Sequence, residues 1–381
     1  MEVTLHRSLT EIDPQQWEAL TQADFPFADH THLLALEQSG CVGPEAGWVP
    51  FYLCVRAGTE LGAPLLAATF FYLKNNSYGE FIFDHAWANA YARSKIPYFP
   101  KMVSAVPFTP ATGNKILVRP GAKKGELEQV LISKMVEIAK SLKCSSLHFL
   151  FIPESTVPGF EKAQFLIRHS HQYHWHNKNY TSFEHFLQAL KPKRRKQIAL
   201  ERRQLAESGV EIETLTGDQL TAEHARLMCA LYLDTNQKMS SHACLNLPFF
   251  KQTFQTMRQN IVLFVAKKGG ETVAAAINYK KGAHMYGRYW GCTEDVRNLH
   301  FELCYYRAIE YSIENKIELY EAGAQGEHKI PRGFVPQTTL SAHEIFHPQF
   351  RHAIAAFLEE EKVGLREMFA EYAPHLPYRE G

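Results

Sequence analysis

Two stretches of the chain share one order of apolar and polar positions. In 131–154, apolar residues recur at helical spacing, and SLHFLF follows a short polar turn as a nearly continuous apolar run. In 304–327 the helix-like RAIEYSIENK is likewise followed by IELYEAG. In each stretch the helical spacing predicts an amphipathic helix, and the apolar run that follows predicts a buried strand. Because the two copies lie further apart than solenoid repeats do, we interpret them as parts of two related domains.

The flanking patterns extend both halves in the same way. PFYLCVRAG and APLLAATFFYLK predict a hairpin in the first half, and SYGEFIFDHAW predicts a further strand. NIVLFVAKKGGETVAAAINYKKGAHMYGRYWG predicts three strands in the second half, with KKGG as a hairpin turn. Each half thus has a helix, an antiparallel meander, a second helix and a last strand. We predict an α/β protein of the mixed α+β kind, with domains 1–170 and 171–381.

Composition and charge exclude several classes to which this protein could belong. Hydrophobic residues make up 45% of the chain and charged residues 21%, as in ordinary globular proteins. The net charge of +1 argues against DNA binding through a uniformly basic surface, so tRNA would need a local basic patch. The N-terminal sequence lacks a signal-peptide core, and no apolar run predicts a transmembrane segment. The chain has seven Cys and no C-x-x-C pair, which fits a reducing, cytoplasmic compartment. Peripheral contact with a membrane stays open.

A strongly basic helical segment opens the second half, at 183–213. Pro192 marks the start of its basic helix and Gly209 its end, so that this helix covers about 190–210. Arg194 and Arg195 lie in the first turn, where a nucleotide cofactor, a lipid pyrophosphate or RNA would find cations. A solvated helix face accounts for the same charges, and the residues alone leave both interpretations open.

Four long stretches resemble a known family, namely 78–117, 190–203, 287–311 and 320–354. In them the chain is similar to the FemAB-like proteins of peptidoglycan biosynthesis or recognition, which belong to the Fem acyltransferases. The resemblance implies two tandem GNAT-like domains, each a mixed, mostly antiparallel sheet flanked by helices. It also implies an N-acyltransferase that uses acyl-CoA or aminoacyl-tRNA as donor, and a small-molecule or peptide amine as acceptor.

The resemblance raises the question of where the donor's phosphates bind. GNAT domains hold the pyrophosphate of acyl-CoA on a glycine-rich turn that opens a helix. At the matching place this chain has GCTEDVRNLHF, with Glu294 and Asp295 opposing an anion. The first half offers TPATGNKILVRPGAKKGE, where Gly113, Lys123 and Lys124 precede a predicted helix. We take these three residues, with Arg194 and Arg195, as candidates for binding the donor. Acyl-CoA and aminoacyl-tRNA both stay open, and no metal is expected.

The segment 320–336, YEAGAQGEHKIPRGFVP, concentrates groups that acyl transfer needs. Transfer to an amine requires a base for its proton and donors for the oxyanion, and no covalent enzyme intermediate is needed. Glu327 and His328 are candidate bases, with Glu321 as a further catalytic candidate. Lys329 and Arg332 could clamp a phosphate or carboxylate. An exposed polar loop tip is the alternative interpretation.

The segment 78–91 supplies further candidates. Strand alternation puts Glu80, Ile82 and Asp84 on one face and the residues between them on the other. Asp84 and His85 then leave the strand as candidate catalytic groups at the acceptor, with Trp87 as a substrate contact. The alternative is a capped turn in which Asp84 binds backbone amides.

The strand GRYWG and the residues after it add candidate substrate contacts. Tyr286, Arg288 and Trp290 share one strand face, which suits a sugar or peptide, although aromatic packing inside a sheet accounts for them equally well. By resemblance, a substrate cleft is lined by 78–91, 286–302 and 320–334, and this adds His300 and Glu302.

Two motifs suggest metals but favour other structures. H343-EIFH-347 matches the zinc-protease pattern, which needs both His on one helix face. Pro348 follows directly and QTTLSA precedes it, so we predict a strand there instead. HSHQYHWH at 169–176 lacks Cys and carboxylate ligands, and we predict a polar strand and linker.

A non-catalytic binder of peptidoglycan fragments or lipid remains the alternative to an N-acyltransferase.

Overall fold

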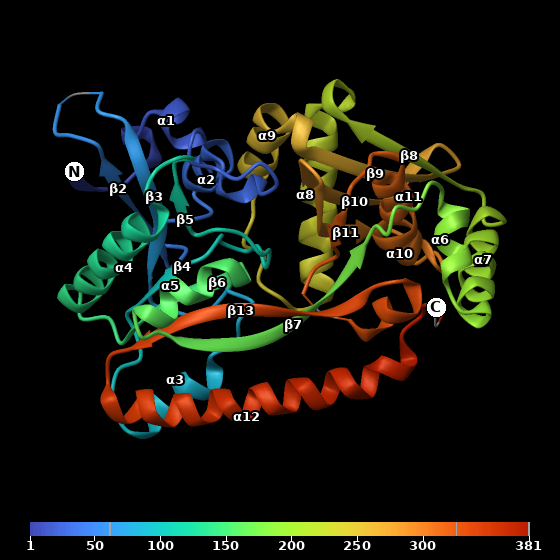
Figure 1. Ribbon diagram of the computed structural model, residues 1–381. Helices are drawn as coiled ribbons and strands as arrows, with labels where there is room; N and C mark the ends of the chain where they lie inside the picture. The colour runs from blue at the N-terminus through green and yellow to red at the C-terminus, as the bar shows by residue number, and fades with distance from the viewer. Residues whose placement is uncertain (61, 325, 380–381) are drawn as a thin grey trace. The chain divides into compact units, whose positions relative to one another are not determined.

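The computed structural model describes residues 1–60, 62–324 and 326–379. They form two compact units (Figure 1). The first unit contains residues 1–170 and 338–367, and the second contains 171–337 and 368 onward. The chain therefore passes from one unit to the other after residue 170 and twice more near the C-terminus.

The first unit is built on a mixed sheet. Its strands, in spatial order, are β1 (Glu2–His6), β2 (Trp48–Arg56), β3 (Leu65–Lys74), β4 (Lys101–Ser104), β6 (Ser146–Ile152) and β13 (Val335–Ile345), with β5 (Ile116–Val118) also beside β3. Neighbours are antiparallel except β4 and β6, which are parallel. The helices are α1 (Pro14–Glu18), α2 (His30–Gln38), α3 (His85–Arg93), α4 (Lys124–Ser141), α5 (Val157–Lys162) and most of α12 (Pro348–Tyr372).

Helical periodicity explains how this sheet is covered. Leu127, Leu131 and Met135 recur every four residues on α4 and are buried in one core cluster with the strand residues Phe71 and Phe149. A smaller cluster joins Trp87 and Tyr91 of α3 to Ile354 and Leu358 of α12. The predicted hairpin, helix and SLHFLFI strand of the first half are thus confirmed.

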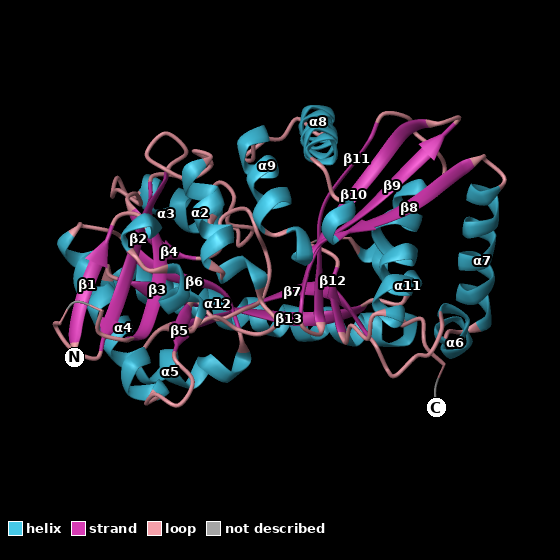
Figure 2. Cartoon of the chain, turned by 90° about the horizontal axis from the view of Figure 1, so that it is seen from above, coloured by secondary structure: helices cyan, strands magenta, loops and turns pink. Residues whose placement is uncertain are grey.

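The strands of the second unit also include parallel and antiparallel neighbours, and Figure 2 shows β8 to β11 as neighbouring strands. The order is β7 (Leu166–His176), β12 (Leu319–Glu321), β11 (His284–Cys292), β10 (Glu271–Lys281), β9 (Ile261–Lys268) and β8 (Val210–Thr216). All pairs are antiparallel except β11 with β12. The helices are α6 (Phe183–Ala189), α7 (Pro192–Ala206), α8 (Ala222–Lys238), α9 (Leu247–Thr256), α10 (Leu299–Phe301) and α11 (Arg307–Glu314). The predicted three-stranded meander is confirmed.

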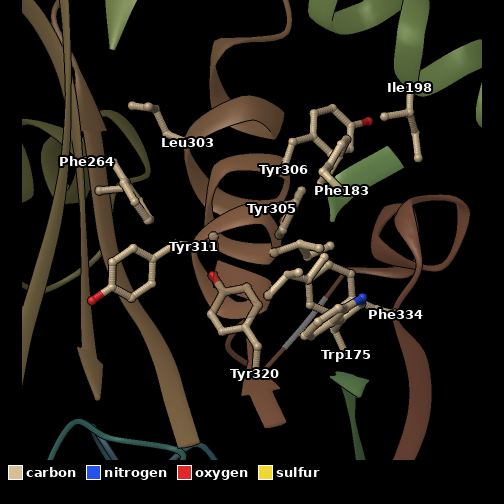
Figure 3. Packing of buried hydrophobic residues seen from close by; sticks show 14 of the residues in the cluster. Trp175, Phe183, Ile198, Phe264, Leu303, Tyr305, Tyr306, Tyr311, Tyr320 and Phe334 are labelled. Carbon is tan, nitrogen blue, oxygen red and sulfur yellow. The ribbon is translucent and has the colours of Figure 1, made fainter. Parts of the chain in front are cut away.

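The core of the second unit is rich in aromatic rings (Figure 3). Trp175 of β7 and Tyr320 of β12 are buried there with Phe334, which lies just before β13. Tyr305 and Tyr306 enter the same cluster from the π-helical turn Glu302–Tyr306, which joins α10 to α11. Large rings contribute much buried area each, and edge-to-face pairs such as Tyr305 with Phe334 add specific geometry.

One predicted strand is wrong. Residues 75–84 form turns and bends rather than a strand. Gly79 has a φ of 78° and Phe81 a φ of 60°, and such values reverse the chain direction locally. The carbonyl of Tyr78 accepts hydrogen bonds from side chains, Trp48 Nε1 and Lys74 Nζ, instead of from a neighbouring strand. The predicted alternation nevertheless appears in the burial, because Glu80, Ile82 and Asp84 are buried.

Candidate active site

A pocket of about 140 Å³ opens in the second unit where two parallel strands diverge. β11 and β12 pair only along 284–286 and 319–321. In the ladder with β10, Ile277 faces Tyr289 and Asn278 faces Gly287, so Arg288 is an extra bulged residue. A bulge of this kind bends a strand and re-aims its side chains. The pocket is lined by residues 276–278, 287–290, His300, Cys304, Tyr305, Tyr320 and Ala322.

The π-helical turn presents two of the lining side chains. A π turn inserts an extra residue into a helix and is frequent at functional sites. Cys304 and Tyr305 both belong to this turn and both line the pocket. His300, one turn earlier, packs its ring against Trp290 at 5.0 Å and against Tyr305 at 5.4 Å. Burial, helped by the neighbouring His328, lowers the pKa of His300 to about 4, so that this ring is neutral at pH 7.

A histidine–tyrosine pair lies at the pocket. His328 Nε2 is 2.8 Å from the hydroxyl of Tyr305. His328 is exposed overall, but partial burial of its ring and the adjacent cations Lys329 and Arg332 lower the pKa of His328. Burial also raises the pKa of Tyr305, which keeps its proton. At neutral pH the pair therefore combines a neutral imidazole with a protonated phenol, and these are the states that can accept and donate a proton.

Lys329 is a buried lysine beside this pair. Its side chain is 3% exposed, and Nζ donates a hydrogen bond to the carbonyl of Gly323 at 2.9 Å. Burial lowers the pKa of Lys329 to about 8, although the electrostatic effect of nearby Cys304 acts in the opposite direction. A lysine with such a pKa exists in both protonation states near neutral pH, which is unusual for this side chain.

Arg332 is held by the protein itself. Its guanidinium lies 3.4 Å from the centre of the Phe301 ring, Nη2 pairs with Glu201 of α7 at 3.0 Å, and Nη1 donates to the carbonyl of His328 at 2.6 Å. The last of these contacts restrains the backbone of His328, whose side chain reaches Tyr305. The role of Arg332 as a phosphate or carboxylate clamp stays a prediction.

The predicted acidic candidates of this unit lie in different surroundings. Glu327 is exposed and accepts a hydrogen bond from the hydroxyl of Tyr372 at 2.6 Å. Glu321 is buried at the end of β12, with His174 Nε2 at 3.9 Å. Glu302 is buried and pairs with Arg202 at 2.9 Å; burial raises the pKa of Glu302 and Arg202 opposes this. None of the three lines the pocket among the described residues.

The candidates of 78–91 belong to the first unit. Asp84 is buried at the N-cap of α3, forms a very short contact with Lys101 Nζ, and accepts from the Tyr98 hydroxyl at 2.6 Å. Burial raises the pKa of Asp84, but Lys101 outweighs it and brings the pKa to about 2. His85 is exposed, and Trp87 is buried beneath Arg168, whose guanidinium is 5.1 Å from its ring centre.

The candidates for donor binding are scattered. Gly113 lies in a buried segment, and a side chain there would meet the ring of Phe25 at 2.5 Å. Lys123 and Lys124 are exposed near the start of α4 and pair with glutamates of the same helix. Arg194 and Arg195 lie in the first turn of α7 in the second unit, where both are partly exposed. Their roles stay predictions.

The structure thus brings only some predicted residues to one place. Arg288, Trp290 and His300 line the pocket, and His328 reaches it through Tyr305. Tyr286 is buried on β11 just before the pocket begins. The sequence reasoning missed the lining residues Asn278, Cys304 and Tyr305, whereas Tyr289 and Tyr320 fall within the predicted ranges 286–302 and 320–334 without having been singled out. The only signal for Tyr305 was its place in the stretch 304–327, just before the predicted helix RAIEYSIENK.

The two metal-like motifs belong to strands. His343 lies in β13, as predicted, and its Nδ1 is 2.7 Å from Nδ1 of His148 on β6. The histidines of 169–176 lie on β7, a predicted strand that is confirmed. Among the described residues, no group of three or more His, Cys, Asp or Glu side chains could hold a metal ion.

Comparison with known proteins places the chain in a family. The FemAB-like family model, described as peptidoglycan biosynthesis/recognition, matches residues 8–380. The chain belongs to the FemAB-like family. The resemblance of its four long stretches is thereby confirmed. No curated protein matches the sequence.

Several solved structures share the fold of this chain. The crystal structure of FemX is 10% identical, with a TM-score of 0.53 over 93% of this chain and 100% of that one. A conserved protein of unknown function from Bacteroides thetaiotaomicron is 10% identical, with a TM-score of 0.54 over 90% and 100%. L-PGS from Bacillus licheniformis is 11% identical, with a TM-score of 0.51 over 91% and 97%. The predicted mixed α+β fold class is confirmed.

Proposed function

We propose that this FemAB-like protein is an N-acyltransferase and that the pocket of its second unit is the reaction site. In this proposal, an acyl or aminoacyl group passes from acyl-CoA or aminoacyl-tRNA to an amine. The observation that carries it is the pair formed by His328 and Tyr305, a neutral base and a protonated acid 2.8 Å apart at the pocket. Acyl transfer to an amine needs both functions, and it needs no nucleophilic side chain.

The pair can account for every proton in the reaction. The amine nitrogen attacks the acyl carbon and gives one proton to the neutral His328. The bond from that carbon to the sulfur or oxygen of the donor breaks, and Tyr305 protonates the leaving atom. His328 then returns its proton to Tyr305 through their hydrogen bond, which restores the starting state. In this proposal, Arg288 and the other donors that line the pocket would stabilise the oxyanion.

The basic first turn of α7 and the family description guide the choice of donor and acceptor. Both candidate donors carry phosphates, and the basic first turn of α7 with Arg194 and Arg195 would suit either of them. The family description, peptidoglycan biosynthesis/recognition, supports a peptide that resembles a peptidoglycan precursor as acceptor. We therefore include such a peptide among the amines to be assayed.

The test compares variants of the pair with a matched tyrosine variant. Turnover is measured with acetyl-CoA and with aminoacyl-tRNA against a panel of amines. We expect Tyr305→Phe and His328→Gln each to lower kcat by about 10²–10⁴-fold, the usual contribution of acid–base catalysis. Tyr372→Phe removes a hydroxyl that bonds to Glu327 away from the pocket, and it should retain activity. Equal effects of Tyr305→Phe and Tyr372→Phe would refute the assignment.

One observation favours a non-catalytic binder instead. The turn from β11 to α10 has no glycine to cradle a pyrophosphate, and Glu294 occupies it, paired with Lys268 at 3.0 Å. A calorimetric titration with acetyl-CoA, CoA and aminoacyl-tRNA separates the two functions. If none of these donors binds, the enzyme proposal fails and recognition of peptidoglycan fragments or lipid becomes the better-supported function.

A further inference from the structure

The exposed aromatic side chains of the described residues gather in one short segment of the first unit. Tyr78 is 69% exposed, Phe83 55% and Phe81 38%. All other Phe, Tyr and Trp side chains in the described ranges are buried or half-buried. Single exposed apolar residues are common, but here three exposed rings lie within six residues of one loop, and concentrated exposed apolar surface marks protein or membrane interaction sites.

This segment also presents no ionised Asp, Glu, Lys or Arg to solvent. Across 75–92 the sequence contains no Lys or Arg, and its two acidic residues are Glu80 and Asp84. Both are buried, at 3% and 4% exposure. In a chain with 21% charged residues, such a stretch of surface is unusual. Its exposed polar groups are the neutral amides of Asn75 and Asn89 and the ring of His85.

The loop 75–84 is fixed from beneath by buried ion pairs. Lys101 Nζ contacts Asp84, Glu80 at 2.8 Å and the Ser77 hydroxyl at 2.9 Å, and it is completely buried. Lys74, equally buried, lies 3.6 Å from Glu80. Buried ion pairs seldom add much to stability, but they hold groups in one geometry.

Backbone contacts and a strained residue complete this support. The amide of Phe108 donates to the carbonyl of Gly79 at 3.1 Å, and Trp48 Nε1 donates to that of Tyr78. Phe81 has a φ of 60°, a left-handed value that bulky residues rarely adopt. Strain of this kind persists where the surroundings enforce it and is common at binding sites. Here it leaves the rings of Phe81 and Phe83 exposed while Ile82 is buried.

We propose that the loop 75–84 docks the protein on the surface of a lipid bilayer, with Tyr78, Phe81 and Phe83 entering the boundary between headgroups and acyl chains. Aromatic side chains concentrate at that level in membrane proteins. The lack of exposed charge suits an apolar boundary and disfavours nucleic acids and acidic peptides, which need cations. Because the loop is already rigid, docking costs little conformational entropy.

Vesicle binding of the full chain tests this docking. The protein is mixed with neutral phosphatidylcholine vesicles, and the bound fraction is measured by co-flotation at low and high salt. We expect binding that salt hardly changes, and a loss of about tenfold or more in partition for Tyr78→Ser or Phe83→Ser, since one buried ring contributes at least one tenfold step. Met239→Ser, at the most exposed methionine of the second unit, is the matched control and should bind as the unchanged protein does.

Two further arms measure binding through charge and binding to sugars. Anionic vesicles at low salt measure attraction to the basic helix α7, which high salt should abolish. Purified peptidoglycan sacculi measure binding of the same rings to sugars. The proposal is overturned if neutral vesicles are not bound, if Tyr78→Ser and Phe83→Ser bind them normally, or if only the sacculi respond to these variants. Circular dichroism verifies that both variants fold. The outcome does not depend on whether the protein transfers acyl groups.

Discussion

Removing the charge of Lys329 should make the protein more stable. The ordinary pKa of a lysine in the unfolded chain is 10.5, and burial lowers that of Lys329 to about 8. This lowering of the pKa corresponds to about 3 kcal/mol of unfavourable free energy for the charged form in the folded state. The lost hydrogen bond to Gly323 offsets about 1 kcal/mol of this. We therefore expect Lys329→Met to raise the free energy of unfolding by about 2 kcal/mol at pH 7.

The sign of the pH dependence gives a second check. Between pH 8 and 10.5 the unfolded chain binds more protons at Lys329 than the folded chain does, so the stability of the unchanged protein rises with pH in this window. Lys329→Met lacks that rise, and its advantage should shrink over the same window. Urea unfolding at pH 7 and at about pH 9.5 measures both effects.

A matched lysine shows whether the effect is specific. Lys193, which is exposed on α7, serves as control, and Lys193→Met should change the unfolding free energy by less than about 0.5 kcal/mol. The reasoning is refuted if Lys329→Met destabilises the protein at pH 7. It is also refuted if the gain is the same at both pH values, because the burial of a charge would then not be its cause.

Three other expectations concern the folded state. Asp84→Asn leaves Lys101 buried with a weaker partner and should cost about 3–5 kcal/mol in urea unfolding. Gly291→Ala would place its Cβ 2.4 Å from the carbonyl oxygen of Leu231, and a drop of several degrees in Tm in calorimetry is the expected result. Burial lowers the pKa of His148 to about 3, so stability should fall as pH drops from 6.5 toward 3; His148→Gln should reduce the slope of a pH-dependent unfolding series by up to about 1.4 kcal/mol per pH unit.

Local patterns predicted most elements of this fold and failed where side chains replace backbone partners. The KKGG turn was predictable because Gly269 and Gly270 take left-handed φ values that suit a two-residue hairpin. SYGEFIFDHAW alternates like a strand, yet the carbonyl of Tyr78 accepts hydrogen bonds from the side chains of Trp48 and Lys74. Trp48 is distant in sequence and Lys74 lies outside the segment. The alternation of apolar and polar residues within the segment could therefore not reveal either partner.

The candidate site was predictable only in part for a similar reason. The polar segment around His328 stands out in composition, but composition could not separate His328 from Glu327. Their difference arises from position, since His328 contacts Tyr305 of a distant helix while Glu327 contacts Tyr372. Tyr305 itself sits in a π-helical turn, and no spacing rule applied to the sequence predicts where a helix widens by one residue.

The return of residues 338–367 to the first unit has a consequence for synthesis. β13 pairs with β6 there, with His343 opposite His148, and α12 completes a core cluster with α3. A ribosome that has made residue 170 must therefore add nearly the whole second unit before β13 and α12 can complete the first unit. At roughly 5–20 residues per second this delay lasts on the order of 10–40 s. During that time β6 lacks its neighbour β13. Chaperones and proteases would therefore meet a first unit whose sheet is still incomplete.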